Sequence, residues 1–95
     1  MSAYVVAMVN VTDPEKYAKY SAKASIACDK FGGEFIVRGG NPEVVEGNVP
    51  YGRIVVIRFE TREQAHAFYD SMQYRDAKQE RLGAADFNLA IVDGV

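Results

Sequence analysis

The chain has 95 residues, which is a typical length for one domain, and we expect a single domain over residues 1–95. Its hydrophobic content of 48% and charged content of 25% are ordinary for a globular protein. The net charge is −2, and eleven Lys and Arg residues are dispersed among thirteen acids. This distribution argues against a nucleic-acid-binding protein, which needs a concentrated basic surface.

The first third of the chain predicts a strand followed by a helix. Residues 3–11 are rich in Val and read as a strand. Thr12 or Asp13 can then cap a helix that has Pro14 in its first turn. Apolar residues recur at three- and four-residue spacing along this helix, at Tyr17, Tyr20, Ala24, Ala27, Cys28 and Phe31. The pair Gly32-Gly33 predicts its end, because glycine adopts the left-handed conformation at little cost.

The rest of the chain predicts three more strands and two helical segments. The strands are expected over residues 34–38, 53–60 and 86–93, and the helical segments over 62–72 and 73–83. Residues 43–52 could hold a short strand or hairpin arm. The order β-α-β-β-α-β predicts a ferredoxin-like α+β fold, with a four-stranded antiparallel sheet and its helices on one face.

The sheet should have two apolar faces. Alternation along the strands gives the face without helices a set of apolar residues, namely Val6, Met8, Ile36, Ile54, Val56, Ala90 and Val92. An antiparallel sheet normally shows a polar face to water, so this pattern predicts a homodimer through the sheet face. The same alternation places Arg38 on that face beside Ile36 and Glu34.

A pattern of short segments extends over the whole chain. It comprises Tyr17 and Tyr20 in "DPEKYAKY", "GGEFIVRGG" over 32–40, Glu46-Gly47, Arg53 in "RIVVIRFE", "AHAFYDSMQY" over 65–74, Arg81 and the closing "VDGV". Together these segments resemble the small bacterial proteins of the domain-of-unknown-function 1330 family, in the dimeric α/β-barrel superfamily. The resemblance implies a ferredoxin-like dimer and no established reaction, cofactor or substrate. Arg58 stands where the family typically has an acid, which would change the charge of a pocket that used this position.

Polar residues among the apolar ones suggest a ligand pocket near the sheet and its loops. The candidate ligand-binding residues are Arg38, Glu46, Arg53, Tyr20, Tyr74 and Arg81. Arginine has a planar donor fork that suits carboxylates, so the expected ligand is a small polar or carboxylate metabolite. The alternative is an internal network of salt bridges and hydrogen bonds that fixes the register of the loops and the dimer.

Three classes of function stay open: a small-molecule-binding homodimer, which we favour; a cofactor-independent enzyme of the monooxygenase or isomerase type, by fold analogy; or a protein-interaction module.

We expect no cofactor and no metal, because the chain has one cysteine, Cys28, and one histidine, His66. We expect Cys28 to be buried and His66 to be near solvent. We also expect no membrane association and a cytoplasmic location, because neither a signal peptide nor a run of about 20 apolar residues is present.

Overall fold

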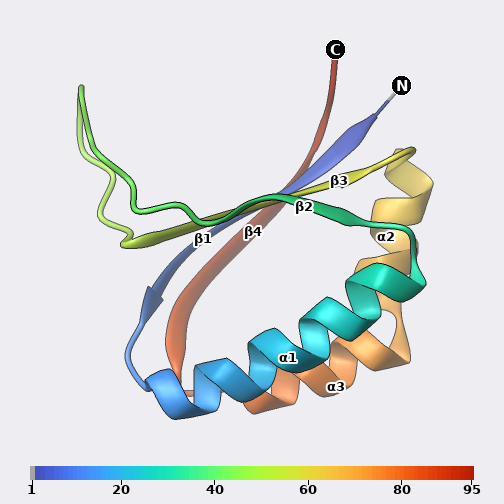
Figure 1. Ribbon diagram of the computed structural model, residues 1–95, viewed down its shortest axis with the longest axis horizontal. Helices are drawn as coiled ribbons and strands as arrows, with labels where there is room; N and C mark the ends of the chain where they lie inside the picture. The colour runs from blue at the N-terminus through green and yellow to red at the C-terminus, as the bar shows by residue number, and fades with distance from the viewer. Residues whose placement is uncertain (1) are drawn as a thin grey trace.

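A computed structural model describes residues 2–95 of the chain. It contains four strands and three helices in the order β1 (Ala3–Val11), α1 (Pro14–Lys30), β2 (Glu34–Gly39), β3 (Arg53–Phe59), α2 (Arg62–Asp70), α3 (Met72–Glu80) and β4 (Ala85–Asp93). The strands form one sheet in the order β2-β3-β1-β4, and all neighbouring strands are antiparallel. All three helices lie on one side of this sheet (Figure 1). The predicted ferredoxin-like arrangement is therefore confirmed. No helix in the described part of the chain is long and apolar enough to cross a membrane.

Helix α1 begins and ends where the sequence predicts. The Asp13 side chain accepts a hydrogen bond from the Lys16 N–H, which satisfies one of the free donors at the helix start. At the other end, the Gly33 N–H donates to the Cys28 carbonyl at 2.9 Å, in the pattern of a Schellman motif. A Cβ at Gly33 would lie 2.6 Å from the Cys28 sulfur and 2.8 Å from the Phe59 ring. The second glycine of the pair thus lets the chain pass close to the core as it enters β2.

The two predicted helical segments in the second half are distinct helices, α2 and α3, separated by Ser71. The backbone of Ser71 is extended, with ψ at 155°. Its hydroxyl donates to the Phe68 carbonyl and accepts the Tyr74 N–H, at 2.7 and 3.0 Å. Ser71 therefore caps both helices, and α3 starts in a new direction that buries Tyr74, which is 1% exposed.

The prediction that Arg38 lies on the sheet face without helices is wrong, because β2 contains a β-bulge. Phe35 pairs with Ile57, and Val37 pairs with Val56, so one extra residue lies between them on β2. This extra residue shifts the alternation by one position. Arg38 consequently pairs with Val55 and lies on the same side of the sheet as the helices, and not beside Ile36 and Glu34 as alternation alone predicts.

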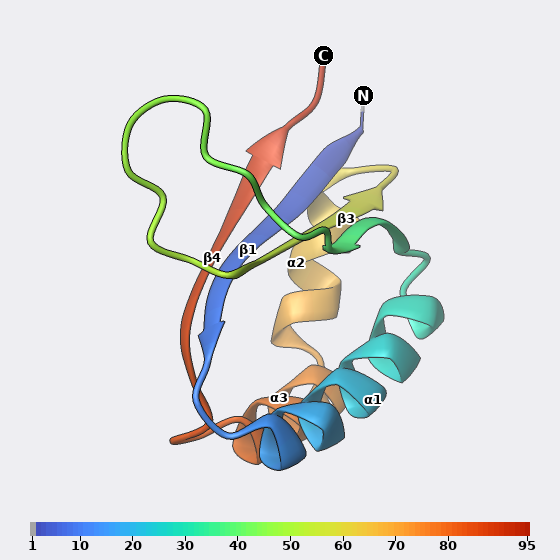
Figure 2. The ribbon, with the colours of Figure 1, turned by 60° about the vertical axis from the view of Figure 1, so that its left-hand side comes forward.

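Residues 40–52 form an irregular loop and contain no strand, so the short strand or hairpin arm considered for residues 43–52 is absent. The loop extends away from the helices and the sheet (Figures 1 and 2). It carries the exposed side chains of Val44, Val45 and Val49.

We call the sheet surface away from the helices the outer face. Its central residues are Val6, Met8, Ile54 and Val56, with Val37, Ala90 and Val92 toward its edges, and Ile36 is the unpaired bulge residue of β2. The four central side chains are half-buried, whereas Ile36 and Val92 are 47% and 44% exposed. Figure 2 shows no helix on this side. The second apolar face predicted from the sequence is therefore present in the chain.

Candidate functional site

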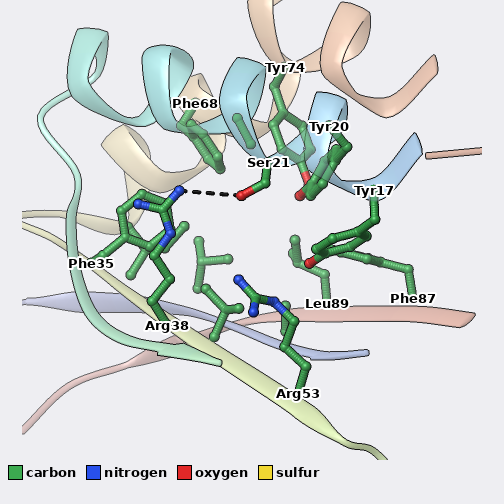
Figure 3. Close-up of a pocket in the computed structure, with 15 residues that line it drawn as sticks. Tyr17, Tyr20, Ser21, Phe35, Arg38, Arg53, Phe68, Tyr74, Phe87 and Leu89 are labelled. Carbon is green, nitrogen blue, oxygen red and sulfur yellow. Dashed lines mark hydrogen bonds between the residues drawn. The ribbon is translucent and has the colours of Figure 1, made fainter. Parts of the chain in front are cut away.

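A cleft lies between the helices and the inner face of the sheet (Figure 3). Its wall is mostly apolar and aromatic, and contains Val5, Ala7, Tyr17, Tyr20, Ser21, Ala24, Phe35, Arg38, Arg53, Val55, Ile57, Phe68, Tyr74, Phe87 and Leu89. The empty volume is about 420 Å³, part of which is open solvent. The space that the centres of water-sized groups can occupy is about 30 Å³, which is room for about two such groups. A small ligand could place its end inside and keep the rest near the opening.

Arg38 comes from β2 and reaches from the sheet toward α1. Its Nη2 donates to the hydroxyls of Ser21 and Ser25, which lie one helical turn apart on α1. Its guanidinium lies 4.3 Å from the centre of the Phe35 ring. Since Arg38 is largely exposed, it stands at the opening of the cleft, held by two neutral hydroxyls and an aromatic ring.

Arg53 is at the start of β3 and is a diagonal neighbour of Arg38 on the adjacent strand β2. Because Arg38 pairs with Val55, the two arginines share the inner face, with Cα atoms about 7–8 Å apart in ideal geometry. The Arg53 guanidinium lies 5.4 Å from the Tyr17 ring centre. Its Nε is buried and has no hydrogen-bond partner among residues 2–95. A Cβ on Gly39 would lie 2.8 Å from Arg53 Nη1, so this glycine leaves the space that the guanidinium occupies.

Arg38 and Arg53 have no carboxylate partner among residues 2–95. The salt bridges within residues 2–95 join Lys23 to Glu80 and Arg62 to Asp93, both away from the cleft. The cleft wall itself contains no Asp or Glu. The salt bridges of the alternative network are therefore absent around Arg38 and Arg53 within residues 2–95, whereas the hydrogen bonds from Arg38 to Ser21 and Ser25 fit its hydrogen-bonded part. The cleft carries positive charge at its opening beside an apolar interior, an arrangement that suits an anion with an apolar body.

Tyr20 of α1 and Tyr74 of α3 meet at the helix side of the cleft. Their hydroxyl oxygens are 2.7 Å apart, which is a hydrogen bond in which either group can donate. The side chains are 7% and 1% exposed. Burial is the main cause that raises the pKa of both phenols, and the neighbouring phenol adds to the rise at Tyr20. Both therefore stay protonated at neutral pH and act as neutral hydrogen-bonding groups.

Arg81 follows α3 and packs behind the tyrosine pair. Its guanidinium lies 3.8 Å from the Phe87 ring centre and 5.3 Å from that of Tyr20. Arg81 also lowers the pKa of Tyr74 through its charge and a hydrogen bond, against the larger effect of burial. Its Nε is buried without a hydrogen-bond partner in the described chain. Arg81 thus places a third positive charge near the cleft without lining it.

The family model for a domain of unknown function, DUF1330, matches residues 2–95. The chain belongs to this family. A comparison with functionally curated proteins finds no match. Membership in the DUF1330 family therefore agrees with the resemblance seen in the sequence and assigns no reaction.

Solved structures of other proteins share the fold of this DUF1330 chain at low sequence identity. RPA0582 from Rhodopseudomonas palustris, a protein of unknown function, is 16% identical with a TM-score of 0.79, covering 99% of this chain and 82% of that one. A dimeric ferredoxin-like protein of unknown function from Jannaschia sp. CCS1 is 12% identical with a TM-score of 0.79, covering 99% and 100%. SnoaB, a cofactor-independent oxygenase from Streptomyces nogalater, is 7% identical with a TM-score of 0.67, covering 99% and 93%. At these identities the likeness shows the fold alone.

The structure brings most of the candidate residues together. Arg38, Arg53, Tyr20 and Tyr74 line the cleft, and Arg81 lies directly behind it. Glu46 does not join them, because it is exposed on the loop over residues 40–52.

Among the cleft residues that sequence reasoning missed are the three that contact Arg38 or Arg53, namely Tyr17, Ser21 and Phe35. Tyr17 belongs to the apolar stripe of α1 and to the family pattern but is not among the candidate ligand-binding residues, and its ring lies beside Arg53. Ser21 and Ser25 are polar positions four residues apart at the edge of that stripe, a spacing that could have indicated a shared polar partner.

The other singled-out side chains lie outside the cleft. Cys28 is fully buried and His66 is exposed, as predicted. Arg58 pairs with Tyr4 and Glu34 across the neighbouring strands and lies on the outer face, so its difference from the family-typical acid does not alter the cleft. Residues 2–95 contain no group of three or more His, Cys, Asp and Glu side chains placed to hold a metal ion.

Proposed function

We propose that the chain forms a homodimer that binds a small carboxylate with a short apolar body in this cleft. The observation that carries the proposal is the pair Arg38 and Arg53, which share the inner face and have no carboxylate partner among residues 2–95. Arg53 has a buried Nε without a partner and Arg38 stands at the opening, so two positive charges lie beside an apolar wall with no counter-charge among residues 2–95. A ligand carboxylate would supply it, and the planar donor forks match its two oxygens.

The homodimer is part of the proposal. The outer face is apolar at its centre and no helix covers it (Figure 2). A contiguous apolar face of this kind is uncommon on a small soluble monomer. The related fold from Jannaschia sp. is described as dimeric, which supports the same expectation for this chain. Pairing through the outer face would leave the cleft, on the opposite side of the sheet, free to bind its ligand. The cytoplasmic location stays a prediction from the sequence.

Enzyme catalysis receives less support from the cleft. A cofactor-independent oxygenase or isomerase that removes a proton from its substrate needs a general base. No residue that lines the cleft is a carboxylate or a histidine, and burial raises the pKa of Tyr20 and Tyr74 so that they remain protonated. These groups can bind and orient a ligand, but they are poorly suited to accept a proton at neutral pH.

Thermal unfolding with hexanoate and with its neutral analogue hexanamide tests the proposal. We expect hexanoate to raise the Tm and hexanamide to leave it unchanged, because only the acid carries the charge. At ten times the Kd, binding adds about 1.4 kcal/mol of stability, which is a Tm increase of roughly 5–10 °C for a chain of this size. Arg38→Ala and Arg53→Ala should each remove this increase. Arg75→Ala is the matched control, because Arg75 is an exposed arginine on α3 away from the cleft. Equal effects of both compounds, or retention of the shift in both cleft variants, would contradict the proposal.

A further inference from the structure

The tyrosine pair holds one hydrogen-bond donor more than the chain uses. Two phenols have two O–H groups, and one of them makes the bond between Tyr20 and Tyr74. Within residues 2–95 neither hydroxyl donates a second hydrogen bond, and the hydrogen bond with Arg81 uses Tyr74 only as an acceptor, because a guanidinium can only donate. One O–H is therefore left at a buried position without a protein acceptor. Buried polar groups are normally hydrogen-bonded, so this donor requires a water or a ligand.

The spare donor lies at the cleft. Tyr20 and Tyr74 both line it, and their hydroxyl ends point from the helices toward the strands (Figure 3). Arg38 and Arg53 approach from the strands on the other side (Figure 3). The cleft therefore has cationic groups on its sheet side and a neutral O–H donor on its helix side, and apolar side chains such as Val55 and Leu89 also line it.

The surroundings favour an oxygen acceptor at this donor. Burial keeps both phenols protonated, so the pair offers an O–H and no negative charge. The positive charge of Arg81 lies behind the rings and makes the O–H a stronger donor. The same charge disfavours a cationic group at this end of the cleft.

We propose that the Tyr20–Tyr74 pair selects a carbonyl oxygen, so that the preferred ligands are short oxo acids that place their carboxylate at Arg38 and Arg53. This inference rests on the proposed carboxylate-binding function and narrows its ligand class. The ketone oxygen accepts the spare O–H, and the chain between the ketone and the carboxylate packs on the apolar wall. An acid without the ketone still pairs its carboxylate with Arg38 and Arg53, but it offers no acceptor to the spare O–H of the tyrosine pair.

The test compares hexanoate with 4-oxohexanoate and 5-oxohexanoate, which share its length and differ from it in one carbonyl group. The Kd of each acid is measured by NMR titration on wild type and on the double variant Tyr20→Phe/Tyr74→Phe. The double variant retains both rings and removes both hydroxyls together, so no unpaired hydroxyl is left behind. Its dispersed NMR spectrum and an unchanged Kd for hexanoate show that the fold and the arginine end are intact.

We expect at least one oxo acid to bind wild type about five- to tenfold more tightly than hexanoate, and the double variant to bind all three acids with equal affinity. Equal affinity of the three acids for wild type would overturn the inference and leave carboxylate binding in place. An oxo-acid preference that survives in the double variant would also overturn it, because the carbonyl would then be recognised elsewhere. Failure of all three acids to bind wild type would overturn both proposals.

Discussion

Tyr20 and Tyr74 lie 54 positions apart in the sequence, and their hydroxyl oxygens are 2.7 Å apart in the fold. This hydrogen bond joins α1 to α3 at the cleft, and the two rings meet edge to face with centroids 6.1 Å apart. The bond therefore contributes to packing as well as to the chemistry of the cleft, and these two contributions can be measured separately.

A double-mutant cycle on this pair should show strong coupling. Tyr20→Phe or Tyr74→Phe alone leaves one buried hydroxyl without its partner, so each should lower the free energy of unfolding by about 1–3 kcal/mol. The double variant replaces both partners with apolar groups of the same shape and should be nearly as stable as wild type. Urea unfolding of the four proteins measures the coupling. Additive losses would show that each hydroxyl contributes independently of the other.

The fold could be predicted because its local signals agree with one another. The apolar stripe from Tyr17 to Cys28, the cap at Asp13 and the Gly32-Gly33 stop all indicate one helix, and the structure confirms it. The strands likewise follow alternating or continuous apolar runs. These signals depend on residues close in sequence, which the printed sequence displays directly.

The site could be predicted only in part, because its geometry depends on a feature with no local signature. The bulge between Phe35 and Val37 moves Arg38 from the expected outer side to the cleft. No glycine or proline marks the bulge, and strict alternation therefore gives the wrong face. Glu46 is a candidate residue from the family pattern, where it stands in Glu46-Gly47, whereas the structure leaves it exposed on the loop over residues 40–52.

Gly39 should be needed for ligand binding more than for stability. Gly39→Ala places a Cβ against Arg53 Nη1, and the guanidinium can move because it is the end of a flexible side chain. Both Gly39 and the control Gly47 have positive φ, at 90° and 79°, and nothing lies within 4 Å of a Cβ at Gly47. We expect each alanine variant to lose about 1–2 kcal/mol of stability from backbone strain. Only Gly39→Ala should also weaken hexanoate binding, measured by NMR titration. Similar Kd values for the two variants would show that the position of Arg53 is not set by Gly39.

Cys28 should react slowly in the folded chain. It is fully buried, and burial raises the pKa of its thiol to about 11, with the charge of Asp29 acting in the same direction. At pH 8 about one thiol in a thousand would then be the reactive thiolate. Iodoacetamide labelling, followed by mass spectrometry, should be much slower for the native chain than for the chain in concentrated urea. Its rate should keep rising between pH 9 and 10, because the thiol is still mostly protonated there. Labelling of the native chain as fast as that of the unfolded chain would contradict this prediction.

A charge at the centre of the outer face should separate the proposed homodimer into monomers. Val56 lies on β3 and pairs with Val6 on β1, so it is near the middle of the apolar surface. Val56→Glu would place a carboxylate in an interface that has no basic residue paired to this position, which is costly when the interface is dry. Wild type should sediment at micromolar concentration with a mass of about 21 kDa, twice the chain mass of 10.5 kDa. The Glu variant should sediment near the mass of one chain.

Ala67→Glu is the matched control for this experiment, because Ala67 is exposed on α2, on the opposite side of the sheet. It introduces the same charge and should leave the dimer intact, so a difference between the two variants can be attributed to the outer face. Circular dichroism should show that both variants keep the secondary structure, since Val56 is only half-buried within one chain. A monomeric wild type would reject the proposed homodimer. A dimer that survives Val56→Glu and dissociates with Ala67→Glu would place the interface on the helices, where it would border the cleft instead of leaving it free.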